Sequence, residues 1–338
     1  MRTLATLTSG VTGRSPFRAL LFTLAISLGL VFGSPLPAQA NNTGASEELL
    51  IAAATDTAEE IMERAGREST PFKKRELLQQ AINTLEKDTA LNPKNDEAYY
   101  QLGVAYVKMQ EVASDRADWN NAQAKAIDAF EMAVRLNSQY EHAWADLAEV
   151  YFSHSEDLCD SDPEESIRLF NKSDAVFVRA LAAMPSSNLL WYLWASDYAI
   201  HAYNVPNPER RQFREQAAEM FVKAIEFMQD DEYAWRMLAK VWWRIADDLP
   251  AGDPELQSLW TKSHDTFLKA YEITPKGSAY PIALLGAHIG KDGDYVRQYL
   301  IRALGIGELP SGEELMEEEA FDRFHNDAWF KELVQATT

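Results

Sequence analysis

The sequence predicts an all-α protein made of repeated antiparallel helix hairpins, and three observations support this prediction. First, a small-x3-large-x2-small pattern recurs at intervals of 45, 47, 44 and 46 residues, beginning at Ala81, Ala126, Ser173, Ala217 and Ser263. Second, an aromatic pattern begins 11 residues after the end of each of the first four copies, at Tyr99, Trp144, Trp191 and Trp235. Third, a proline that follows a helix-capping residue lies 9 or 10 residues before four of the first-pattern positions.

Each pattern places apolar residues on one stripe of a helix, because residues three and four apart share a helix face. The stretch 126–151 shows both, with Phe130 in the first pattern and Trp144 in the second. The gap between the two patterns is long enough to end one helix, turn and begin an antiparallel neighbour. A recurring unit of two helices predicts an α-solenoid, since each unit buries its apolar stripe against the next.

The two patterns together, A-x3-F-x2-A and W-x2-L-[GA]-x2-Y, resemble the tetratricopeptide repeat (TPR) family. This resemblance implies a TPR-like solenoid of about five to six hairpins, in the form of an exported bacterial TPR protein with enlarged repeats. The family repeat has about 34 residues, whereas the intervals here are 44 to 47. The surplus is explained by the capping pairs, because proline is favoured at the first helical position and would start each second helix early, giving it about 20 residues. These pairs are Thr70-Pro71, Asp162-Pro163, Asn207-Pro208 and Asp253-Pro254.

The predicted order along the chain is a signal peptide at 1–40, a short tether at 41–45, the solenoid at 46–309 and capping helices at 310–338. The first hairpin is expected at 46–65 and 71–91, and a shorter last hairpin at 278–304. Ser311-x-x-Glu314 is typical of a capping box, and Asp327 is expected to cap the final helix. The ends of a solenoid need a polar outer surface, which the acidic segment 312–319 would supply.

Residues 1–40 have the composition of an export signal. Three arginines precede the first acid, Glu47, and the apolar run 19–32 is shorter than the ~20 residues that span a membrane. The sequence Ala38-Gln39-Ala40 fits a small-residue cleavage site. We therefore predict cleavage after Ala40 and a soluble protein of the periplasm or cell envelope. Retention of the segment as an uncleaved anchor is the alternative. An organelle transit peptide is disfavoured, because the central run is apolar throughout instead of amphipathic.

The chain carries 32 basic and 52 acidic residues, a net charge of −20, and removal of residues 1–40 would take away three arginines and no acid. Nucleic-acid binding depends on neutralising phosphates with Lys and Arg, so this charge argues against a nucleic-acid partner. It permits a basic partner, although an acidic surface also serves solubility alone. The single cysteine, Cys159, cannot form an internal disulfide.

The sequence contains no motif of a nucleotide-binding, hydrolase or metalloprotease site. The six histidines are scattered, and no two lie three or four residues apart, so no single helix offers a pair of metal-binding imidazoles. We expect no enzymatic activity, no cofactor and no metal site.

The TPR resemblance implies that the first helix of each hairpin lines a concave surface, where ligands meet residues just after the Trp-type position and one and two turns on. Arg236, Lys240 and Arg244 would form a basic stripe on one such helix. This stripe has the chemistry to hold a carboxylate of a peptide or of an acidic small molecule. Pairing with acids on neighbouring helices is the alternative. The candidate partner-binding residues are Tyr100, Phe152, Tyr192, Arg236, Lys240, Trp243 and Arg244.

Two hypotheses on function remain open. The first is a non-enzymatic scaffold or assembly factor that binds a protein or peptide, as the TPR resemblance implies. The alternative is a periplasmic small-ligand-binding TPR protein associated with a solute transporter, because enlarged repeats would be able to enclose a pore. An open polar surface favours the first hypothesis, and a closed apolar cavity of several hundred cubic ångströms favours the second.

Overall fold

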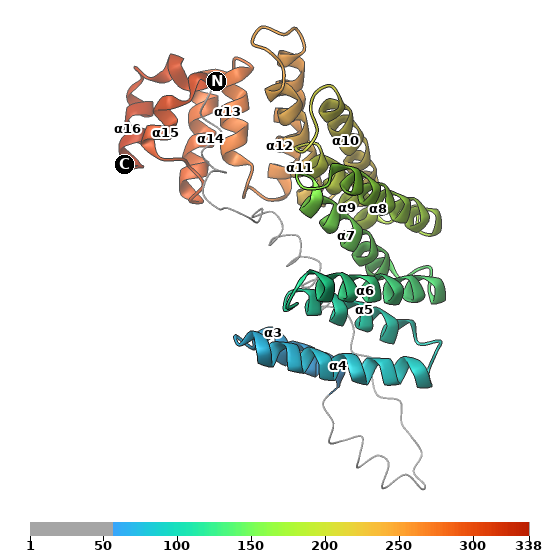
Figure 1. Ribbon diagram of the computed structural model, residues 1–338. Helices are drawn as coiled ribbons and strands as arrows, with labels where there is room; N and C mark the ends of the chain where they lie inside the picture. Colours follow the sequence, from blue (N-terminus) through green and yellow to red (C-terminus); the bar gives the residue numbers. More distant parts are fainter. Residues whose placement is uncertain (1–56, 338) are drawn as a thin grey trace, which may run out of the picture. The chain divides into compact units, whose positions relative to one another are not determined.

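The structure is a computed structural model that describes residues 57–337, and these residues are all-helical (Figure 1). They form fourteen α-helices and one 3-10 helix, paired as TPR-like antiparallel hairpins, so the predicted fold class is confirmed. The elements are α3 (Ala58–Arg67), α4 (Pro71–Leu91), α5 (Asp96–Gln110), α6 (Arg116–Leu136), α7 (Glu141–Leu158), α8 (Pro163–Ala183), α9 (Asn188–His201), α10 (Glu209–Phe227), α11 (Glu232–Asp247), α12 (Leu256–Ile273), α13 (Ala279–His288), α14 (Gly293–Gly305), α15 (Gly312–Glu317), η2 (Glu319–Phe324) and α16 (Ala328–Ala336).

The described residues divide into two compact units, and the boundary falls inside α7, between Ser153 and His154. The N-terminal unit contains the hairpins α3–α4 and α5–α6 and the first part of α7. The C-terminal unit contains the end of α7, α8, the hairpins α9–α10, α11–α12 and α13–α14, and the terminal group α15, η2 and α16. Each unit has its own set of buried apolar side chains.

In the N-terminal unit, the repeat positions form the core. Ala126, Phe130 and Ala133, which carry the first pattern on α6, are fully buried. Gly103 on α5 lies directly against the Phe130 ring, because a Cβ atom at position 103 would come within 2.5 Å of it. The glycine therefore permits the close approach of the two helices of one hairpin.

Gly103→Ala is expected to destabilise the N-terminal unit by about 1–3 kcal/mol, because the Phe130 ring must leave its place in a packed core. The matched control is Gly66→Ala in α3, where a Cβ atom would meet nothing within 4 Å. That control should be neutral or slightly stabilising, since alanine is the better helix former. Urea denaturation of the full chain measures both, and equal free energies of unfolding for the two variants would contradict the packing explanation.

Each tryptophan of the second pattern makes the same kind of hydrogen bond, which the sequence patterns did not predict. The indole Nε1 of each donates to the backbone carbonyl six residues earlier, in the turn that precedes its helix. The pairs are Trp144 with Ser138 at 3.0 Å, Trp191 with Pro185 at 3.0 Å, and Trp235 with Gln229 at 2.8 Å. Each tryptophan therefore ties the turn between successive hairpins to the helix that follows.

The last helices cover the α13–α14 hairpin, in agreement with the predicted capping helices. α13 and α14 share one buried cluster with η2 and α16, in which Phe321 and Phe330 are fully buried. The predicted capping box is confirmed, because the Ser311 hydroxyl accepts from the Glu314 amide and the Glu314 carboxylate accepts from the Ser311 amide. Asp327 precedes α16 as expected, but its side chain caps no backbone amide.

Two of the four predicted proline starts are confirmed and two are wrong. α4 and α8 begin at their prolines and are 21 residues long, which confirms the enlarged second helices. α10 begins one residue after its proline and α12 two residues after. Before α12, the Asp253 carboxylate accepts from the Glu255 amide and the Asp253 carbonyl accepts from the Leu256 amide. These bonds close a turn, so the helix starts later.

Residues 1–56 lie outside the described residues, and with them the predicted signal peptide, the cleavage after Ala40, the tether and the expected helix start at 46. The described helix α3 begins at Ala58, where Thr57 and Glu60 form a capping box. No helix among residues 57–337 is long and apolar enough to cross a membrane.

Candidate functional site

In the N-terminal unit, the candidate residue Tyr100 belongs to an aromatic and polar cluster formed by α5, α6 and the start of α7. Its ring centroid lies 4.8 Å from that of Tyr140 and 5.9 Å from that of Phe130. The Tyr100 hydroxyl donates to the Asp146 carboxylate, and the Tyr140 hydroxyl donates to Glu97. Tyr100 is therefore half-buried and held in place by its own neighbours.

Asp146 makes the stability of this cluster depend on pH. Burial raises the pKa of its carboxyl group to about 6, although Tyr100, His142 and Lys108 act to lower it. This native pKa lies above the ordinary value of 3.8, so the folded state binds a proton at Asp146 more tightly than the unfolded state does. The stability that this proton contributes is present at low pH and is lost as the pH rises through 6. Asp146→Asn keeps an acceptor for Tyr100 and is expected to raise the melting temperature at pH 8 much more than at pH 4. Thermal denaturation measures this, and equal gains at both pH values would contradict it.

The other candidate aromatic residues differ in burial. Phe152 on α7 is only 5% exposed, so it packs in the interior and presents little surface to a partner. Tyr192 on α9 is half-buried and packs edge-on against Phe221 at 5.5 Å. Trp243 on α11 is also half-buried and packs edge-on against Phe267 at 6.3 Å. Tyr192 and Trp243 therefore combine a packing role with some exposed surface.

The two arginines of the basic stripe on α11 have partners of their own. The Arg236 side chain is 16% exposed, lies 3.9 Å from Glu232 and donates to the carbonyl of Lys276 at 3.0 Å. The Arg244 side chain is 44% exposed and pairs with Asp247 at 3.2 Å. Acids therefore pair with both arginines, but these acids come from α11 itself and not from neighbouring helices.

Lys240 lies between these two arginines and differs from both. It is half-buried and forms no ion pair or hydrogen bond with the residues that the structure describes. Burial lowers the pKa of its ammonium group, and the charges of Arg236 and Arg244 lower it further. The charges that act on Lys240 are therefore cationic, and within residues 57–337 it has no counter-charge.

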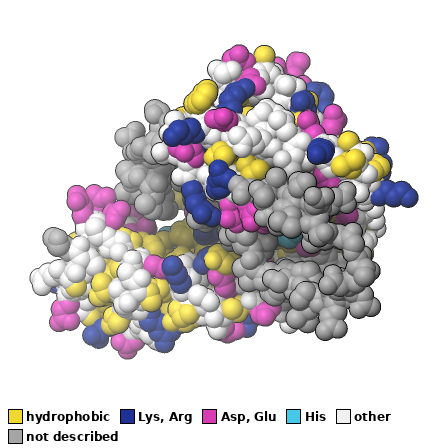
Figure 2. Space-filling view, turned by 90° about the horizontal axis from the view of Figure 1, so that it is seen from below, with side chains coloured by type: hydrophobic (Ala, Val, Ile, Leu, Met, Phe, Trp, Pro, Cys, Tyr) yellow, Lys and Arg dark blue, Asp and Glu magenta, His cyan; other side chains and the backbone are white. Residues whose placement is uncertain are grey.

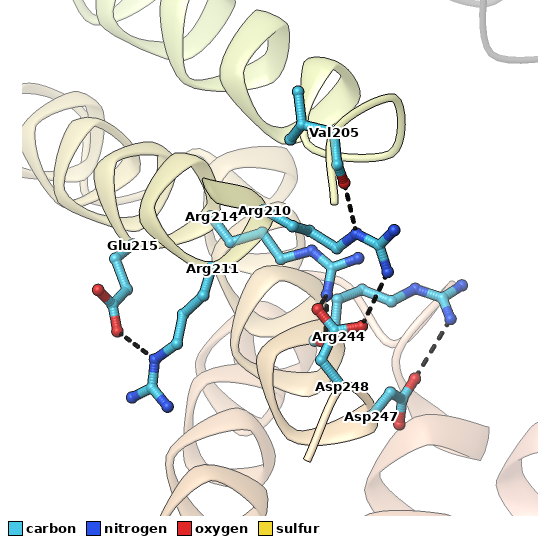
Figure 3. Close-up of polar contacts among 8 residues, drawn as sticks. All are labelled: Val205, Arg210, Arg211, Arg214, Glu215, Arg244, Asp247 and Asp248. Atoms are coloured by element: carbon cyan, nitrogen blue, oxygen red, sulfur yellow. Dashed lines mark hydrogen bonds and ion pairs between the residues drawn. The ribbon is translucent and has the colours of Figure 1, made fainter. Parts of the chain in front are cut away.

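A second group of charges, which the sequence patterns did not indicate, joins α10 to the end of α11 (Figure 3). Arg214 donates to the Asp248 carboxylate and to the carbonyl of Arg244. Arg210 donates to the same carboxylate at 3.5 Å and to the carbonyl of Val205 at 3.0 Å. The Arg214 side chain is only 5% exposed. The sequence places the arginines on one helix, but it does not reveal that two of them meet one aspartate.

A pocket of about 210 Å³ lies beside this group. Arg211 in its wall already pairs with Glu215 and Glu255, at 2.8 Å each. Small-molecule sites usually have ~300–1,000 Å³, so this pocket does not match the cavity that the small-ligand hypothesis requires. The lining residues are Asn207, Pro208, Arg211, Ile245, Asp248 and Leu249.

The described residues form no metal centre, and the face that Figure 2 shows carries charges of both signs. No group of three or more His, Cys, Asp or Glu side chains among residues 57–337 is arranged to hold a metal ion. On the face that Figure 2 shows, Lys and Arg side chains lie among Asp and Glu side chains, with apolar side chains between them. A local arrangement of charges, such as the stripe on α11, therefore says more about a possible binding site than the net charge of the protein does.

A family model matches part of the chain. The model of the plant-specific mitochondrial import receptor subunit TOM20 matches residues 58–148, which belong to the N-terminal unit. This model describes a receptor subunit, in agreement with the expectation of a non-enzymatic protein. No curated protein matches the chain significantly.

Solved structures of TPR proteins are similar to the chain at low identity. YrrB, described as a TPR protein with an unusual peptide-binding site, is 14% identical, with a TM-score of 0.42 over 67% of this chain and 93% of YrrB. TTC0263 of Thermus thermophilus is 15% identical, with a TM-score of 0.41 over 65% and 93%. The type IV pilus biogenesis factor PilW is 16% identical, with a TM-score of 0.39 over 78% and 99%. Similarity at this level does not bear on function.

The predicted location is wrong. The N-terminal residues were interpreted as the signal of an exported bacterial protein of the periplasm or cell envelope, whereas the matching family model describes a mitochondrial import receptor subunit of plants. The apolar run at 19–32 argued against an amphipathic transit peptide, but it did not identify the compartment.

Proposed function

We propose that this chain is a non-enzymatic TPR-like module that holds a peptide segment of another protein on the first helices of its hairpins. In the C-terminal unit these helices are α9, α11 and α13. Their exposed sides carry the half-buried Tyr192 and Trp243 together with the basic stripe. Tyr, Trp and Arg are the residue types that protein interfaces favour, so this surface suits a polypeptide.

The observation that carries the proposal is the position of Arg236 between residues of the neighbouring hairpins. The charge of Arg236 on α11 acts on Tyr192 of α9, and its guanidinium group donates to the carbonyl of Lys276, shortly before α13. Arg236 therefore interacts with residues of the hairpins on both sides of its own.

The family match supports a receptor-like role for the N-terminal unit, and it does not extend to α9, α11 or α13. Residues 58–148 match the model of an import receptor subunit, and a receptor holds another polypeptide without converting it. A role as scaffold or assembly factor uses the same property. The pocket of about 210 Å³, at the end of α11 beside the start of α10, is smaller than the usual small-ligand site and does not support the small-ligand alternative.

Site-directed photo-crosslinking tests the proposal. A photoreactive amino acid would be placed at Ala199 on α9, or at Lys223 on the outer side of α10, where the native lysine is exposed. The full chain would first be used to select peptides from a random phage-displayed library. The selected peptides are expected to crosslink to position 199 and not to position 223. Selection of no peptide, or crosslinking at position 223 alone, would contradict the proposal.

A further inference from the structure

We infer that the surface of α11 around Lys240 binds acidic side chains of the partner peptide. This inference rests on the proposed function and specifies the charge of its ligand. It starts from a difference within the basic stripe: an acid pairs with Arg236 and another with Arg244, whereas Lys240 has no such partner among residues 57–337.

A half-buried cation without a counter-charge is unfavourable, because burial removes part of its hydration and nothing replaces it. Two further cations at i−4 and i+4 add repulsion on the same helix face. A carboxylate from outside would remove both penalties, since it would supply the missing counter-charge and accept charge-assisted hydrogen bonds from the Lys240 ammonium group. The site therefore favours a ligand that carries negative charge.

The flanking residues determine how such a ligand would be held. Arg236 is fixed by its bond to the Lys276 carbonyl and by the ring of Tyr233, which lies 4.7 Å below its guanidinium group. Arg244 is 44% exposed and its bond to Asp247 is solvent-accessible, so it can turn toward a ligand at little cost. Lys240 has a flexible stem with three donors. One fixed and two adaptable cations fit a peptide with two or more acidic side chains at adjustable spacing.

Binding at this site depends on its local charge and not on the overall charge of the protein. The net charge of −20 repels acidic molecules in general, so an acidic peptide would gain nothing from non-specific attraction. At physiological salt, charges more than ~8 Å away are largely screened. The charge near Lys240 therefore decides the binding, and the charge on the rest of the surface does not.

Fluorescence anisotropy with the full chain in 0.15 M salt tests the inference. The probe is a labelled 12-residue peptide of glutamate, aspartate and tyrosine, and a second peptide replaces every acid with lysine. Lys240→Met keeps an apolar stem and removes the charge, while Lys223→Met removes an exposed lysine on α10 that pairs with Glu226. Loss of one charged hydrogen bond corresponds to about tenfold or more in affinity. We expect that loss for Lys240→Met and less than about twofold for Lys223→Met.

A stability measurement keeps the test independent of folding. Lys240→Met should unfold at the same or a higher urea concentration than the unaltered chain, because it removes an unpaired, half-buried charge. A clear loss of stability would show that Lys240 has an internal counter-charge, and it would overturn the inference. Unchanged affinity of Lys240→Met for the acidic peptide would overturn it as well.

The controls separate this inference from the proposed function. If library peptides crosslink at position 199 but the acidic peptide does not bind, the inference fails and the proposed function stands. If no peptide of any charge binds, the proposed function fails with it. Free glutarate at the concentration of the probe should leave the acidic peptide bound. Displacement of the peptide at that concentration would show that the site binds a small acid, and it would overturn the inference of a peptide ligand.

Discussion

Trp144→Ala is expected to destabilise the N-terminal unit by about 3–5 kcal/mol, the usual loss for a buried aromatic residue. Trp144 is 5% exposed, and its Nε1 donates to the carbonyl of Ser138 at 3.0 Å. The substitution therefore leaves a large cavity and also releases the turn before α7. Urea denaturation followed by circular dichroism measures the loss.

Two further variants separate the contributions at this position. Trp144→Phe keeps most of the packing and loses the hydrogen bond, so we expect a loss of about 1 kcal/mol from the missing bond, plus any repacking term. Trp191→Ala removes a tryptophan that makes the same bond but is half-exposed, so its cost should be smaller. A loss below ~1 kcal/mol for Trp144→Ala would contradict the role of this residue as a core position of the repeat.

Asp248→Ala is expected to destabilise the C-terminal unit by a similar amount, about 3–5 kcal/mol, because it leaves a buried cation unpaired. The Arg214 side chain is 5% exposed and donates to this carboxylate (Figure 3). Burial lowers the pKa of Arg214 even with Asp248 beside it, so the desolvation of this guanidinium group is already large. Arg210 would lose the same acceptor.

A matched control and a double variant test this explanation. Glu226→Ala on α10 removes an acid whose partner is Lys223, and both side chains are 50% exposed. An exposed pair contributes at most ~1 kcal/mol, so this control should change little. Arg214→Met combined with Asp248→Ala should recover much of the loss, because the buried unpaired charge is gone and Arg210, which is 32% exposed, keeps its bond to the Val205 carbonyl. A double variant as unstable as the sum of the two single variants would show that the ion pair is not the cause.

The repeat positions could be predicted from the sequence because helix periodicity is a local property. Residues three and four apart lie on one face of any helix, so Phe130 and Trp144 were identifiable as core positions from spacing alone, and both are buried. The capping box at Ser311 is equally local, since its bonds join residues three apart. The same reasoning failed at Asn207-Pro208 and Asp253-Pro254, where turns delay the start of the helix.

The candidate site was only partly predictable. Spacing placed Arg236, Lys240 and Arg244 on one face of α11, and it also places Glu232 and Asp247 four and three residues from the two arginines, a local signal that the sequence analysis missed. Phe152 follows the same pattern as the other candidate residues and is nevertheless buried. Burial depends on which helices cross a given face, and that is decided by residues far away in the sequence.

The sequence by itself therefore determined the all-α class, the hairpin repeat and the enlarged second helices, because these follow from helix periodicity and local capping. Only the tertiary structure decided that Arg210 and Arg214 meet at Asp248 and that Lys240 is left without a counter-charge among the described residues. The physical reason is that the two kinds of feature depend on residues at different distances along the chain. A helix face is set by neighbours along the chain, whereas a contact between elements, such as that of Arg214 with Asp248, is set by how the helices pack.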